Sequence, residues 1–198
     1  VVGAFVLIFG AGLVLDLNQY GYFIDEENLT IPATDKNSDN SEQIGNLYRN
    51  NTYSFRIKFP EGWEQMSGDG PHILWKAVDE GNSINVGVQE FPAEFKNQDI
   101  NIRDVASEEE YFNEIKNGFP GAKLIDSGFT KIDNKDAFYI EYTAPYEALD
   151  VKVVVHNKVW QVVHNNALFM ITAGAPENEY SALEKDFALS VGSFVFEN

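Results

Sequence analysis

The sequence predicts an α+β fold, a layered sandwich in which helices cover a mainly antiparallel β-sheet. The chain has 198 residues, of which 44% are hydrophobic and 14% aromatic, so it can build a full core. Its 15 Phe and 9 Tyr favour a sheet over a helical bundle. Short apolar runs follow one another through turn residues, which is typical of hairpins. The strand–helix alternation of a doubly wound fold is missing.

The predicted strands lie between residues 53 and 172. The first, from Tyr53 to Phe59, alternates apolar and polar side chains at period two and ends at Pro60. The long run from Leu149 to His164 is apolar on both faces in its middle, as expected of a central strand covered on both sides. Further strands are expected at 73–78, 84–88, 123–131, 137–142 and 168–172.

Two amphipathic helices are expected to cover this sheet. Ser107 and Glu110 form a capping-box pattern at the start of the first helix, and Gly118 is expected to end it. The second helix is expected to start at Pro176. Their apolar faces consist of Tyr111, Phe112, Ile115, Tyr180, Leu183, Phe187 and Val191. Asp133-Asn134 and Asn165-Asn166 are expected to form the turns of two hairpins.

An apolar segment precedes the domain. Val1–Leu15 has no charged or polar side chain, and as a helix it would span about 22 Å, less than the roughly 30 Å of a bilayer core. Tyr20, Tyr22 and Phe23 follow it, as at a membrane interface. We predict that residues 1–24 form a helix that anchors the chain in a membrane or packs within an assembly. A buried core helix is the alternative, whereas a cleaved signal peptide lacks its A-x-A site.

Residues 25–52 are polar and acidic, and they are interpreted as a tether to a domain at 53–198. The alternating oxygen donors Asp35, Asn37, Asp39 and Ser41 resemble the first half of a calcium loop. The Gly and the bidentate Glu of such a loop are missing, so any calcium site would be weak. Otherwise we predict no cofactor. Asn28 and Asn50 begin glycosylation sequons, which matter only if the region lies outside the cytoplasm.

Charge and composition exclude several classes of function. The net charge of −17, without a Lys/Arg cluster, repels a phosphate backbone, so nucleic-acid binding is not expected. The absence of cysteine excludes disulfides, thiolate metal sites and Cys nucleophiles. The sequence contains no G-x-S-x-G, Walker or G-x-G-x-x-G motif.

The three histidines do not form a predicted catalytic site. His156 and His164 lie on one expected strand, about 26 Å apart at 3.3 Å per residue, which is too far to share a metal ion. Only a sharp bend near Asn157 would bring them together. We therefore predict no catalytic residues and a domain that works by binding. The alternatives to an accessory binding role are a filament or surface-layer subunit, and an envelope protein that binds a small molecule or a metal.

Several segments together resemble one family. YSFRIKFPEGW at 53–63 is an aromatic strand that runs into Pro-x-Gly-Trp. DAFYIEY at 136–142, VVHNN at 162–166, ALFMITAGAP at 167–176 and GSF at 192–194 follow in order. This order and spacing resemble PsbP-like proteins, whose best-known members are extrinsic subunits of photosystem II. The apolar N-terminal segment and the acidic tether depart from the photosynthetic pattern.

The resemblance implies an α/β/α sandwich around a central, mainly antiparallel sheet. It also implies a non-catalytic protein on the lumenal or extracytoplasmic face of a membrane. Combined with the apolar segment, it predicts a membrane-anchored accessory subunit of a larger membrane protein complex. The expected partners are that complex or copies of this chain, together with the membrane itself through Val1–Leu15.

Overall fold

The computed structural model describes residues 40–68, 72–92, 95, 98–148 and 151–197. In this part of the chain, one antiparallel sheet has the strand order β4-β5-β6-β10-β9-β8-β7 and a smaller one has the order β1-β2-β3-β11. The elements are β1 Ser41–Ile44, β2 Leu47–Asn50, β3 Phe55–Lys58, β4 Glu64–Ser67, β5 Ile73–Asp79, β6 Asn82–Glu90, α1 Ile102–Val105, α2 Glu108–Gly118, β7 Lys123–Ile132, β8 Lys135–Ala148, β9 Val151–His164, β10 Ala167–Pro176, α3 Glu177–Gly192 and β11 Val195–Phe196.

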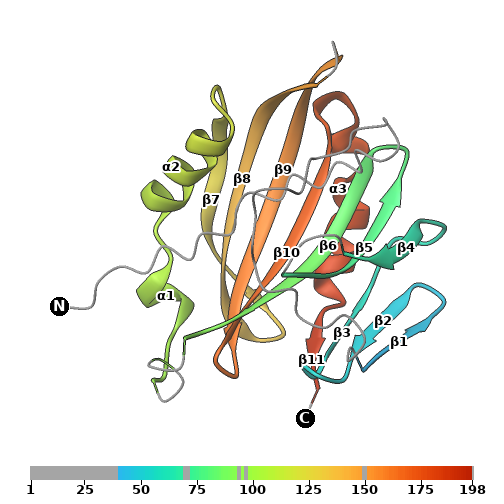
Figure 1. Ribbon diagram of the computed structural model, residues 1–198, viewed down its shortest axis with the longest axis vertical. Helices are drawn as coiled ribbons and strands as arrows, with labels where there is room; N and C mark the ends of the chain where they lie inside the picture. The colour runs from blue at the N-terminus through green and yellow to red at the C-terminus, as the bar shows by residue number, and fades with distance from the viewer. Residues whose placement is uncertain (1–39, 69–71, 93–94, 96–97, 149–150, 198) are drawn as a thin grey trace, which may run out of the picture.

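The large sheet is the middle layer of the molecule (Figure 1). Helix α3 packs on β9 and β10 and also contacts β3 of the small sheet, so these elements share one face. Helix α1 packs on β8 and β9, and α2 packs on β7. We call the side of α3 and the small sheet the first face, and the side of α1 and α2 the second face. The predicted mixed α/β fold is confirmed, but with two sheets in place of one.

Strand β10 shows how the sequence fills both faces. Phe169 and Ile171 point into a core cluster that contains Phe55 and Phe187, on the first face. Leu168 belongs to a second cluster with Ile140 of β8, on the opposite face. Because successive strand residues point to opposite sides, a strand that is apolar at both parities must be covered on both.

Phe169 joins the two sheets. Its ring lies 5.7 Å from Phe55 of β3 and 4.9 Å from Phe196 of β11, both edge to face. Phe194 lies 6.1 Å away, and Tyr53 lies 6.3 Å away. Rings at these separations add a directional term to the burial of apolar area. The small sheet is therefore fixed to the large one by aromatic packing around Phe169, together with the stacking of Tyr48 on Trp75 at 4.9 Å.

The local signals read from the sequence have their expected geometry. The Ser107 hydroxyl accepts a hydrogen bond from the backbone N–H of Glu110, as the N-cap of α2. Asp133 and Asn134, and likewise Asn165 and Asn166, have positive φ at both positions. Two successive residues with positive φ give the two-residue hairpin turn that matches strand twist.

The folded domain begins earlier than the sequence analysis placed it. Strand β2 pairs with β3, and Tyr48 on β2 is fully buried in the first core cluster. Residues 41–50 therefore belong to the small sheet rather than to a tether over 25–52. Their polar side chains hide this role, since only Ile44, Leu47 and Tyr48 are apolar.

The predicted N-terminal helix at residues 1–24 lies outside the described residues. Among the helices that the structure does describe, none combines the length and the apolar character needed to cross a bilayer. Strand β4 and the short helix α1 were not predicted.

Replacing Phe169 tests the link between the sheets. We expect Phe169→Ala to lower the free energy of unfolding by about 3–5 kcal/mol, because it leaves a cavity where several rings meet. Chemical denaturation monitored by circular dichroism measures this loss. Ile125→Ala on the exposed side of β7 is the control and should cost much less. Equal losses in the two variants would contradict the role given to Phe169.

Candidate functional site

The three histidines lie at separate places. Strand β9 keeps a regular register with β10 from Val155 to His164, so no bend brings His156 toward His164. The ring of His156 stacks on Tyr180 of α3 at 3.6 Å, whereas His164 packs against Phe196 at 4.1 Å. Partial burial lowers the pKa of His164, and Lys135 nearby lowers it further. His72 precedes β5, and its carbonyl oxygen accepts a hydrogen bond from the backbone N–H of Val88.

His156 is part of a charged group on the first face, which we call the Glu141 cluster: Glu141, His156, Lys158 and Tyr180. Glu141 Oε1 lies 2.7 Å from His156 Nε2, and Lys158 Nζ donates to Glu141 Oε2, also at 2.7 Å. The side chains of Glu141 and His156 are only 12% and 14% exposed. Burial raises the pKa of the Tyr180 phenol, and Glu141 and Glu184 raise it further.

The contacts within the Glu141 cluster connect β8, β9 and α3. Both carboxylate oxygens of Glu141 are engaged by side chains of β9, which ties β8 to β9 through this carboxylate. Tyr180 is kept neutral by its raised pKa, and Lys158 lies over the rings of Tyr139 and Trp160. These contacts connect β8 and β9 to α3. They also account for the burial of His156 between Glu141 and Tyr180.

A second polar group lies on the second face of the large sheet, and we call it the polar floor. Cross-strand pairing places its members on one side: Lys76 is opposite Asn85, and Asn85 is opposite Thr172. One row further along β10, Gly174 is opposite both Ser83 and Asn157. The polar floor consists of Lys76, Ser83, Asn85, Asn157, Gln161 and Thr172, which are between 1% and 8% exposed.

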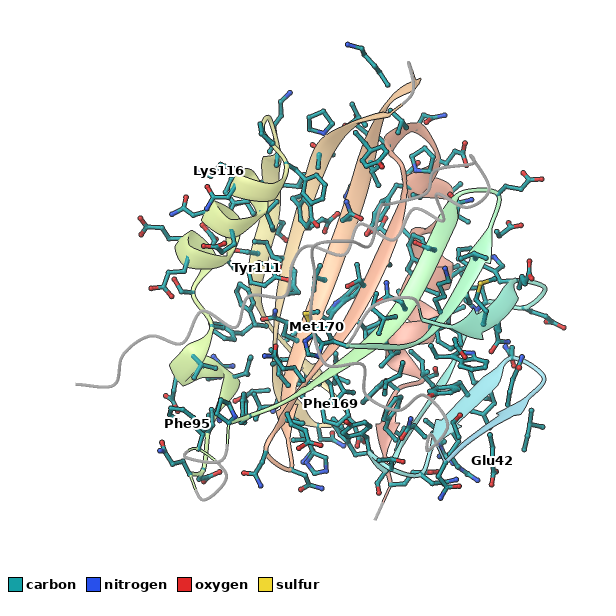
Figure 2. All side chains as sticks on the ribbon, in the orientation of Figure 1. Glu42, Phe95, Tyr111, Lys116, Phe169 and Met170 are labelled. Atoms are coloured by element: carbon teal, nitrogen blue, oxygen red, sulfur yellow. The ribbon has the colours of Figure 1, made fainter. Side chains whose placement is uncertain are left out.

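The polar floor borders the apolar half of the same face at Met170. The Met170 sulfur accepts hydrogen bonds from Gln161 Nε2 at 3.6 Å and from the Tyr111 hydroxyl of α2 at 3.9 Å. Figure 2 shows Tyr111 reaching from α2 toward Met170 over the sheet. Beyond this border, Phe138 and Ile140 continue the face as hydrocarbon. One sheet face is thus divided into a hydrophobic half and an amide-rich half.

The hydrogen bonding of the polar floor is incomplete. In the described part of the chain, the amide nitrogens Nδ2 of Asn85 and Asn157 are buried and have no hydrogen-bond partner. Gln89, further along β6, has a buried amide oxygen in the same condition. Buried polar groups are usually paired, so three such atoms on one face require an explanation.

The residues predicted to bind calcium or carry glycans fall mostly outside the described chain. Asp35, Asn37, Asp39 and Asn28 lie there, and Ser41 is the first residue of β1. Asn50 is fully buried: its Nδ2 donates to the Tyr48 hydroxyl, and its Oδ1 accepts from the backbone N–H of Tyr53. This geometry argues against a glycan on Asn50 in the folded domain.

The described residues also contain no group of three or more His, Asp or Glu side chains placed to hold a metal ion. Sequence reasoning missed the polar floor. The available signal was the alternation of Ser83, Asn85 and Gln89 with Ile84, Val86 and Val88 along one strand. Such alternation normally indicates a water-facing side, and only tertiary structure shows that this side is buried.

The paired antiparallel sheets and the helices on both faces define a mixed α/β fold of the PsbP type. The chain belongs to the PsbP family, whose sequence model matches residues 45–196. A comparison with curated protein sequences finds no match.

Solved structures share this fold at low identity. Cyanobacterial PsbP (CyanoP) from Synechocystis sp. PCC 6803 has a TM-score of 0.56 and 18% identity, over 78% of this chain and 94% of that one. The Ran-binding protein Mog1p of Saccharomyces cerevisiae has a TM-score of 0.50 and 11% identity, over 80% of this chain and 96% of that one. A protein of Bacteroides thetaiotaomicron has a TM-score of 0.51 and 14% identity, but only half of its length is covered. At these identities the likeness shows the fold alone.

Neutralising Glu141 tests the structural role of its cluster. We expect Glu141→Gln to lower the free energy of unfolding by about 1–3 kcal/mol, because Lys158 loses a charged acceptor in a half-buried setting. Equilibrium denaturation at neutral pH measures the change. Asp136→Asn, which breaks the more exposed ion pair with Arg103, is the matched control and should have a smaller effect. An unchanged stability in Glu141→Gln would show that the cluster does not hold β8 and β9 to α3.

Proposed function

We propose that this protein is a non-enzymatic binding domain outside the cytoplasm, anchored to a membrane, which acts as an accessory subunit of a larger membrane protein complex. The observation that carries the proposal is the PsbP family match over residues 45–196. The role of extrinsic subunit is the one that the family resemblance implies. The apolar run Val1–Leu15 supports anchoring, since it lies ahead of the matched region.

The chemistry of the described residues agrees with binding. The histidines are dispersed, and the half-buried Glu141 has both carboxylate oxygens engaged. Covalent catalysis by a side chain needs a nucleophile and a base within hydrogen-bond reach. None of the clusters described above supplies that pair.

The edge strand β7 is the surface on which we expect the partner to dock. It ends the large sheet, and no described strand pairs with its outer edge. Ile125 and Phe129 are 49% and 42% exposed, which is unusual for large apolar side chains on an edge strand. An extended partner segment could add to this edge through backbone hydrogen bonds and bury both side chains.

Cross-linking on intact cells tests sidedness and partner together. Lys123 and Lys131 are exposed on β7, whereas Lys185 is exposed on α3, on the first face. We expect a membrane-impermeant amine cross-linker to join the β7 lysines to a membrane protein of the complex, with few links from Lys185. Mass spectrometry of the linked peptides gives the positions. Phe129→Glu should reduce the yield, and Leu189→Glu on α3 should not.

Other results would overturn parts of the proposal. Links that form only after lysis would place the domain inside the cell. Links only between copies of this chain would favour the filament or surface-layer alternative.

A further inference from the structure

Burying the polar side chains of the floor costs free energy, and the fold does not require polar side chains there. The other half of the same sheet face is closed by hydrocarbon side chains such as Phe138 and Ile140. In the polar floor, Asn85 and Asn157 instead bury amide donors that have no partner in the described chain. Leaving a buried donor unpaired loses the hydrogen bond it would make in water. Unpaired buried donors call for an explanation, and a bound molecule that supplies acceptor atoms is one.

The two asparagines stand on either side of the central strand. Asn85 on β6 is opposite Thr172 of β10, and Asn157 on β9 is opposite Gly174. With strands about 4.8 Å apart and a rise of about 3.4 Å per residue, their Cα atoms are about 12 Å apart. The sheet fixes this spacing, because both strands are hydrogen-bonded to β10 between them.

Gly174 adjusts the position of Asn157. A Cβ atom at Gly174 would lie 2.6 Å from Asn157 Oδ1, so the Asn157 side chain leans over β10 into the space that the glycine leaves. The amide is thereby turned from its own strand toward the strand that separates it from Asn85. Any larger residue at position 174 must push this amide away.

The chemistry of the unpaired atoms limits the ligand. Amide nitrogens donate hydrogen bonds and do not ligate metal ions, so the ligand must present acceptor oxygens. The Thr172 hydroxyl between them can both donate and accept. A ligand hydroxyl satisfies both demands, since it accepts from an amide and donates to Thr172. The net charge of −17 opposes the approach of an anion, and Lys76, the cation of the floor, already has an interaction partner.

We propose that the polar floor is a binding site for a small neutral polyol of the sugar class, whose hydroxyl oxygens accept hydrogen bonds from Asn85 and Asn157. The site lies on the second face of β6, β10 and β9. Sugar binding needs no protein partner. This inference can therefore fail while the proposed function holds, and the proposed function can fail while this inference holds.

The test uses the full chain in a detergent without a sugar head group. Saturation-transfer difference NMR is recorded with glucose, galactose and glycerol, and with acetate as the anionic comparison. We expect at least one of the neutral probes to receive saturation and acetate to receive none. Asn85→Leu and Asn157→Leu should each weaken that binding about tenfold or more, as expected for a lost hydrogen bond to a buried donor. Asn117→Leu, on the exposed surface of α2, is the control and should bind normally.

Gly174→Ala is a second, independent variant, because it displaces the Asn157 amide without removing it. We expect weaker binding with an unchanged circular dichroism spectrum. Binding by none of the neutral probes would overturn the proposal, as would unchanged binding in both Asn→Leu variants. Binding of acetate in preference to the neutral probes would overturn the ligand class.

Discussion

The structure depends most on the burial of β10 from both sides. This strand is hydrogen-bonded to β6 on one edge and to β9 on the other. Its odd-numbered residues enter the core beneath the small sheet and α3, and Leu168 enters the core beneath α1 and α2. Because neither side of β10 faces water, an unpaired polar group on this strand carries an energetic penalty. The two core clusters and the polar floor follow from how the two faces of β10 meet that constraint.

The two faces of β10 are buried by different kinds of side chain. On the first face the buried side chains are largely aromatic. Phe169 packs against rings from β3 and β11, and this packing fixes the small sheet. The charged groups on that side are neutralised among themselves in the Glu141 cluster. On the second face the buried side chains of β8 are hydrocarbon, whereas those of β6 carry amide and hydroxyl groups. A rigid sheet with one incompletely bonded polar region is a suitable frame for a binding protein.

Much of the fold could be predicted because its signals are local. The capping box at Ser107 and the turn at Asn165-Asn166 depend on side chains within three residues of one another. The small sheet could not be predicted in full, since β1 and β2 are polar and are held by pairing with β3 and by the burial of Tyr48. The separation of His156 from His164 was predicted from strand geometry, apart from a bend near Asn157 that the structure does not have. The polar floor could not be predicted, because its burial arises from residues brought together across four strands.

The central claim is that the polar side chains of the floor are not needed for folding. The most direct measurement is the free energy of unfolding of a variant with an apolar floor, Asn85→Leu, Asn157→Leu and Thr172→Val combined, compared with the unmodified chain. Replacing the unpaired amide donors of Asn85 and Asn157, and the buried Thr172 hydroxyl beside them, by hydrocarbon of similar shape should leave stability unchanged or raise it by about 1–3 kcal/mol. A loss of more than about 2 kcal/mol would show that these side chains are structural, and would contradict the account.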